Sequence, residues 1–188
     1  MTPLHPADIA ASLRHGSIAE ALLYLWQQED LVRAYGLDID RMDAELLSRY
    51  PVDEGEHASI RAWYADLMDM LRSEGVAERG HAQVHTNILI WLTDLHHALL
   101  RSPKYPFYSA AYYKALPFIV ELRTRSHTQE RGELENCFEA LYGLMLLRLQ
   151  GKSVSPDTEQ AMSAISKFIA MLAAYYKESK EGTLELDE

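Results

Sequence analysis

Apolar residues recur every three or four positions along almost the whole chain, which is the spacing of one face of an α-helix. Between Glu54 and Glu74, for example, Ile60, Leu67 and Leu71 fall in register. No stretch alternates with a period of two for long enough to predict a strand. The sequence therefore predicts an all-α fold, a single helical bundle of about six main helices plus short helical segments.

Capping signals locate several helix ends. Ser17 and Glu20 have the spacing of a capping box, and Ser155 precedes Pro156, a residue favoured at the first helical position. Pro117 falls inside the expected fourth main helix, where it either kinks that helix or marks its true start. We expect short helical segments at Pro6–Arg14 and after Asp38. We expect main helices at about Ser17–Gly36, Glu54–Glu74 and Ala77–Arg101, then a fourth that ends near Arg125, a fifth at Glu130–Gln150 and a sixth from Pro156 onward.

The chain has 188 residues, which suits one compact domain. We expect this domain to cover residues 1–176, because the apolar stripe of the last helix ends at Tyr176. Residues 177–188 are polar and acidic, and we expect them to form a flexible C-terminal tail.

Charge and composition exclude several classes of protein. The formal net charge of -10 opposes binding to nucleic acid or to an anionic membrane, and no apolar run is long enough to cross a bilayer. The first residues, 1–11, lack the pattern of a signal peptide, so we expect a cytoplasmic protein. A single cysteine, Cys137, leaves no internal disulfide or multi-cysteine zinc site, and we expect it to be a small buried hydrophobe.

Three arginines occupy positions in apolar stripes where a hydrophobic residue would be expected: Arg33, Arg123 and Arg148. An unpaired buried charge costs several kcal/mol, so each guanidinium needs a partner or water. Glu29 lies one helical turn before Arg33 and is its obvious partner. The arginines could form structural ion pairs, or extend outward near helix ends. Alternatively, Glu29, Arg33, Arg123 and Arg148 could line a pocket that binds a carboxylate or phosphate.

His81 and His85 are four residues apart, the spacing at which two histidines of one helix can bind the same metal. The pattern supplies no carboxylate shell around them, so both remain weak metal candidates and we expect no metal or other cofactor. The aromatic segment from Tyr105 to Tyr113 could form an exposed contact surface, because tyrosine combines apolar area with a polar end. The alternative is a packed loop that covers one end of the bundle.

Several segments resemble, in the same order, a bacterial family known only as domain of unknown function 4924. They are IAEALLYLWQQEDLVRAY from Ile18, ELR from Glu121, ENCFEALYGLMLLRLQ from Glu135 and ISKF from Ile165. The resemblance implies a bacterial cytoplasmic protein with one helical domain. It implies no activity, cofactor or catalytic residue.

The sequence contains no nucleophile elbow, glycine-rich phosphate loop or dinucleotide-binding motif, and this favours a protein that is not an enzyme. We therefore expect a non-catalytic helical-bundle protein that acts through protein–protein contacts or self-association as a homo-oligomer. The alternative is a small-anion binding protein or an enzyme that uses Glu29, Arg33, Arg123 and Arg148.

Overall fold

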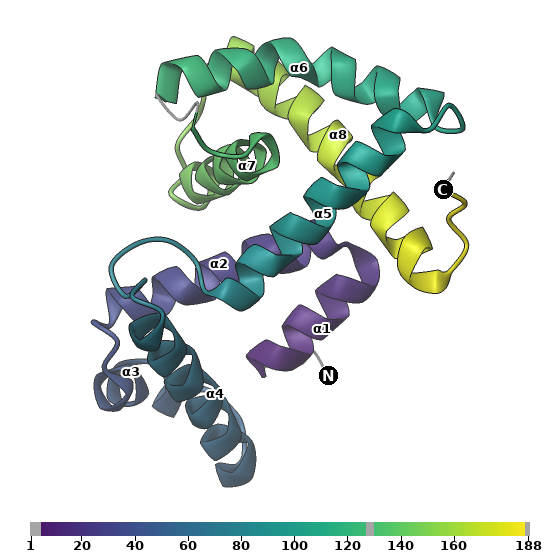
Figure 1. Ribbon diagram of the computed structural model, residues 1–188. Coiled ribbons are helices and arrows are strands. Elements are labelled where there is room, and N and C mark those ends of the chain that lie inside the picture. The colour runs from purple at the N-terminus through teal and green to yellow at the C-terminus, as the bar shows by residue number, and fades with distance from the viewer. Residues whose placement is uncertain (1–4, 127–129, 187–188) are drawn as a thin grey trace. The chain divides into compact units, whose positions relative to one another are not determined.

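A computed structural model describes residues 5–126 and 130–186, and within these ranges it contains helices and connecting segments but no strand (Figure 1). The predicted all-α fold is confirmed. The first four residues of the expected domain and the last two of the expected tail lie outside the described residues. The helices are α1 (Pro6–Gly16), α2 (Ile18–Ala34), α3 (Ile39–Glu45), the short 3-10 helix η1 (Leu47–Arg49), α4 (Glu54–Ser73), α5 (Gln83–Arg101), α6 (Pro106–Ser126), α7 (Glu133–Leu149) and α8 (Pro156–Glu181).

Capping side chains explain why most predicted helix starts are confirmed. The Ser17 hydroxyl accepts the Glu20 backbone N–H at the start of α2, and the Ser155 hydroxyl accepts that of Thr158 at the start of α8. At the end of α2, Gly36 adopts a φ of 69°, a left-handed conformation that terminates the helix.

Three expectations require correction. The third main helix, α5, begins at Gln83 rather than near Ala77, because Gly75 and Gly80 both have positive φ and the chain between them is irregular. The aromatic segment from Tyr105 to Tyr113 is not a loop but largely the first turns of α6, which continues through Pro117. The last helix extends to Glu181, so the expected tail begins with helical residues.

Contacts divide the chain into two compact units, of which the N-terminal unit ends at Ile88 and the C-terminal unit begins at Leu89. Helix α5 therefore starts in the first unit and ends in the second. The expected single domain of residues 1–176 stays a prediction. None of the described helices has the length and hydropathy needed to span a membrane.

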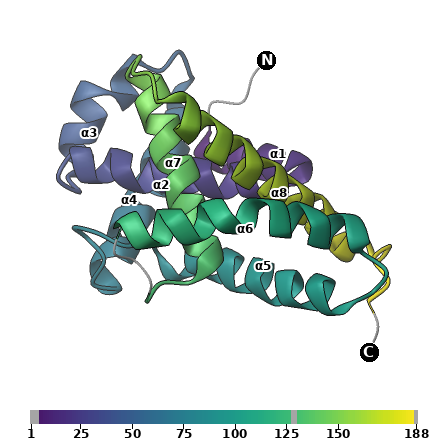
Figure 2. The same ribbon diagram turned by 90° about the horizontal axis from the view of Figure 1, so that it is seen from above.

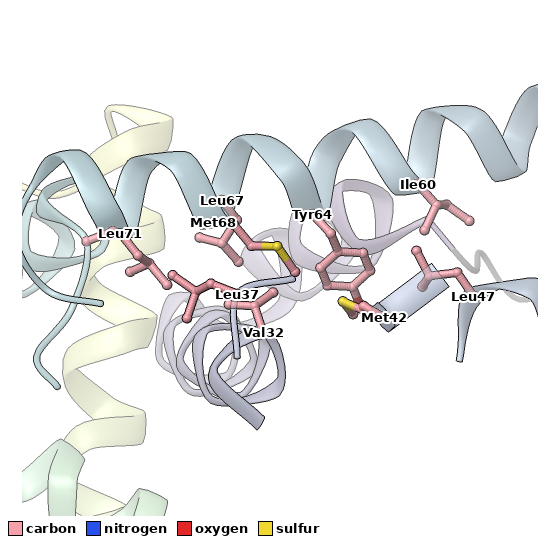
Figure 3. Packing of buried hydrophobic residues seen from close by; sticks show 10 residues of the cluster. Val32, Leu37, Met42, Leu47, Ile60, Tyr64, Leu67, Met68 and Leu71 are labelled. Carbon is pink, nitrogen blue, oxygen red and sulfur yellow. The ribbon is translucent and has the colours of Figure 1, made fainter. Parts of the chain in front are cut away.

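The N-terminal unit is built around a hydrophobic core between α2, α3 and α4 (Figure 3). Tyr64 extends from α4 toward Met42 of α3, and its hydroxyl donates a 2.8 Å hydrogen bond to the buried Gln28 side chain of α2. Each fully buried large apolar side chain contributes roughly 1.5–3 kcal/mol. The core residues are Val32, Leu37, Met42, Leu47, Ile60, Tyr64, Leu67, Met68, Leu71 and Ala82.

In the C-terminal unit, α6 and α8 run side by side in opposite directions (Figures 1 and 2). Ring contacts set their register, since Tyr105 lies 5.0 Å from Tyr175 and Tyr112 lies 5.5 Å from Phe168 between ring centroids. Helix α7 packs against both of them. One side of α6 is thereby buried, and the opposite side is left exposed.

Two glycine substitutions should have opposite effects on stability. Gly36→Ala places a Cβ on a left-handed residue and should lower the free energy of unfolding by about 1 kcal/mol. Gly143→Ala lies inside α7, where a Cβ meets no atom within 4 Å, and should raise that free energy by roughly 0.5–1 kcal/mol. Urea unfolding of the two variants measures both changes, and equal signs would contradict the backbone assignment.

Candidate functional site

The carboxylate of Glu29 is the centre of a buried polar cluster in the N-terminal unit. Its side chain is 0% exposed. One oxygen, Oε2, lies 2.6 Å from Nδ1 of His81, and the other, Oε1, accepts hydrogen bonds from Nδ1 of His85 at 2.6 Å and from the Ala82 backbone N–H at 2.9 Å. Because an ionised carboxylate only accepts hydrogen bonds, each imidazole must carry a proton on Nδ1. Glu29 therefore fixes a proton on Nδ1 of both rings.

The side chain of Arg33, one turn further along α2, binds the backbone of the segment that connects α4 to α5. Its guanidinium also lies 3.8 Å from Glu29 Oε2 and 3.1 Å from Asp30 Oδ1. Its remaining donors point to three carbonyl oxygens, those of Val76 at 3.0 Å, Ala77 at 3.3 Å and Gly80 at 2.6 Å. The predicted Glu29–Arg33 pair is confirmed, but most of the hydrogen bonds of the arginine go to the main chain.

Glu29 and Arg33 together provide hydrogen-bond partners for backbone groups of an irregular segment and of the helix that follows it. The first backbone N–H groups of a helix have no partner within that helix. At the start of α5, the Ala82 N–H donates to Glu29 and the Gln83 N–H donates to Glu74 at 2.6 Å. A negative charge is also favoured there by the helix dipole. The cluster therefore acts as a clamp, defined here as Glu29, Arg33, His81 and His85, that anchors residues 76–85 to α2.

The electrostatic balance of the clamp favours the ionised carboxylate. Burial alone would raise the pKa of Glu29, but the hydrogen bonds from His81, His85 and the Ala82 N–H, together with the charge of His85, outweigh it. The net effect lowers the pKa of Glu29 from 4.5 to about 2. The carboxylate therefore carries its charge throughout the physiological pH range.

The two weak metal candidates have a different role from the one their spacing suggested. His81 precedes α5, so His81 and His85 do not lie on one helix, and both Nδ1 atoms already bind Glu29. The His81 ring also stacks on Trp26, with centroids 3.9 Å apart and planes inclined by 8°. Among residues 5–126 and 130–186, no group of three or more His, Cys, Asp or Glu side chains could hold a metal ion.

The other two candidate arginines belong to the C-terminal unit. Arg123 is half-buried and donates to the Arg131 carbonyl at 3.1 Å. Arg148 is 64% exposed and lies 3.7 Å from Glu159, which agrees with the interpretation that it extends outward near a helix end. It lies in the last turn of α7, where a long side chain readily extends into solvent. One pocket formed by Glu29, Arg33, Arg123 and Arg148 stays a prediction, since the first two residues belong to the other unit.

A second buried polar group, which the sequence pattern did not single out, lies in the C-terminal unit. Nδ1 of His96 lies 2.6 Å from the Tyr108 hydroxyl, and the rings of Tyr112 and Phe168 also contact His96. Burial, with a smaller contribution from His97, lowers the pKa of His96 to about 4. Burial raises the pKa of Cys137 to about 12, so this thiol is a packing group rather than a nucleophile, as its sequence context predicted.

The exposed side of α6 carries large apolar side chains. Phe107 is 78% exposed, Tyr113 63% and Val120 53%. We define the outer face of α6 by its exposed residues Phe107, Ala110, Tyr113, Lys114, Pro117, Val120, Glu121, Thr124 and Arg125.

Comparison with known proteins identifies one family. The model of the family described as Domain of unknown function (DUF4924) matches residues 7–183, which confirms the resemblance seen in the separate segments. No curated protein and no solved structure matches the chain.

Replacing Glu29 should test the clamp directly. Glu29→Gln removes a buried charge and turns an NH2 group toward groups that already donate, so the free energy of unfolding should fall by about 3 kcal/mol. Asp30→Asn is the matched control, because Asp30 also contacts Arg33 but its side chain is 50% exposed. It should cost less than about 1 kcal/mol. Equal losses in urea unfolding would mean that Glu29 is an ordinary surface partner.

The depressed pKa of Glu29 also predicts a difference in acid stability. A carboxyl group whose pKa is lower in the folded state contributes stability that is complete above its ordinary pKa of 4.5 and is lost as the pH falls toward about 2. Between neutral pH and about pH 3, the free energy of unfolding of the wild type should therefore fall by about 2 kcal/mol more than that of Glu29→Gln. Parallel pH profiles of the two free energies of unfolding would contradict the assignment.

Proposed function

Since the chain belongs to this family of unknown function, we propose that it is a non-catalytic helical protein that acts through protein–protein contacts. The contact surface is the outer face of α6. The observation that carries the proposal is the exposure of Phe107, Tyr113 and Val120 on one helix whose other side is already packed.

The position and composition of this face support a binding surface. Helix α6 packs against both α7 and α8 in the C-terminal unit (Figure 1). Single exposed hydrophobic residues are common on proteins, but three large ones on the exposed side of one helix favour a partner. Tyrosine is enriched in interfaces, and the charged Lys114 and Glu121 beside the apolar residues resemble the polar rim of an interface.

The polar clusters support a structural rather than a catalytic role for the buried residues. In the clamp, Glu29 and Arg33 bind the backbone of residues 76–82, and both histidines bind Glu29. Arg148 extends outward. The alternative, a small-anion pocket, stays a prediction that no observed contact favours.

Photocrosslinking in the cells that produce the protein tests the proposed contact. A photoreactive phenylalanine derivative placed at Tyr113 should yield covalent adducts with a discrete increase in mass. The same derivative at Ala170, an exposed residue of α8 in the same unit, is the matched control and should yield much less adduct. No adduct at Tyr113, or the same adducts at both positions, would contradict a contact surface on α6.

A further inference from the structure

We propose that the partner of the outer face of α6 is a second copy of the same chain. The two copies of α6 pack antiparallel around a two-fold axis at Pro117. This inference rests on the contact function proposed above and names its partner. It follows from the way that the exposed side chains are distributed around the helix.

Small residues run along the middle of the outer face. At about 100° and 1.5 Å per residue, Ala110, Pro117 and Thr124 lie within roughly 20° of one line and are each two turns apart. All three are exposed. The distance between two packed helices depends on the side chains at their contact, so this line lets a second helix approach closely.

Tyr113 and Val120 lie on one flank of that line, and they match each other across the proposed axis. Tyr113 and Val120 are displaced by roughly 40–60° to the same side of Pro117. Tyr113 lies about 6 Å before Pro117 along the helix, and Val120 about 4.5 Å after it. A two-fold axis perpendicular to the antiparallel helices keeps each flank on its own side and places positions before Pro117 opposite positions after it. Tyr113 of each copy therefore meets Val120 of the other copy.

The charged residues lie on the other flank with the same symmetry. Lys114 and Glu121 are displaced by roughly 40–60° to the opposite side, about 4.5 Å before and 6 Å after Pro117. The two-fold axis therefore brings Lys114 to Glu121 of the second copy. In a parallel pair, the two-fold axis would run along the helices and exchange the flanks, so Lys114 would face Tyr113 and Glu121 would face Val120 of the second copy. The charge pattern thus selects the antiparallel arrangement.

The edge of the face provides a further match. Phe107 and Arg125 are both displaced by roughly 80° to the side of Lys114 and Glu121, about 15 Å before and 12 Å after the axis. Arg125 pairs with Glu121 of its own helix at 2.6 Å, and its side chain is 78% exposed. In the pair of copies, its guanidinium lies on the same edge as the Phe107 ring of the second copy, within reach of a cation–π contact. A single pair of helices is a small interface, and the net charge of -10 on each copy opposes it, so the dissociation constant should be on the order of micromolar.

Charge exchange tests the pairing in the full-length protein. Lys114→Glu or Glu121→Lys alone replaces two attractive contacts by two repulsive ones, and each should raise the dissociation constant of the dimer about tenfold. The double variant restores opposite charges across the axis and should return the constant to within about threefold of the wild type. Lys167→Glu, at an exposed lysine of α8, is the control for the net charge of Lys114→Glu.

Sedimentation velocity over a concentration series through the micromolar range provides the readout, with circular dichroism to verify folding. A wild type that stays monomeric throughout would overturn the proposal. So would single variants no weaker than Lys167→Glu, or a double variant without rescue. If Tyr113 crosslinks to a different protein while the chain remains monomeric, the second copy is excluded and the contact function stands.

Cysteine crosslinking gives a second, independent measurement. Pro117→Cys places a thiol on the proposed axis, within disulfide reach of its own copy, and mild oxidation should give a covalent dimer. Thr124→Cys lies on the same exposed line but about 21 Å from its own copy across the axis, and should not crosslink. The buried Cys137 is present in both variants and provides the same background. Equal crosslinking of the two variants would overturn the register.

Discussion

The buried Glu29 carboxylate is the interaction on which the arrangement of the N-terminal unit depends. A buried negative charge is costly without partners, and α2 alone supplies only Arg33 at 3.8 Å. The remaining hydrogen bonds come from residues about fifty positions later, through two imidazoles and one backbone N–H. Burying this carboxylate therefore requires the start of α5 to lie against α2. Arg33 strengthens the same requirement by binding three carbonyls just before it.

Most helices could be predicted because their ends are determined by neighbouring residues. Ser17, Gly36 and Ser155 each act within one turn, and the structure uses all three as expected. The start of α5 could not be predicted in this way, since its N–H groups are satisfied by Glu29 and Glu74 from other helices. The glycines at 75 and 80 were the one local signal that the helix began later.

The candidate site was predictable in part for the same reason. Glu29 and Arg33 are one turn apart, and periodicity alone places them together. The histidines were recognised as a pair, but their spacing suggested a shared helix and concealed that both bind the same carboxylate. For Arg148 the sequence left an inward and an outward side chain open, because a helical stripe gives the direction of the Cα–Cβ bond and not the end of a long side chain. On α6, the aromatic residues were noticed, while their division between a buried and an exposed side required the packing of α8.

Arg33 recognises the segment before α5 by its main chain, and this separates two kinds of tolerance to change. The carbonyl groups of Val76 and Ala77 are present whatever side chains stand there, so the hydrogen bonds to Arg33 do not depend on these side chains, which pack against the core. The number of residues between Gly75 and Ala82 is a different matter. One residue more or fewer would shift the carbonyl groups against the guanidinium and the first N–H of the helix against Glu29. The clamp thus constrains the number of residues in the segment more strongly than their amino-acid sequence.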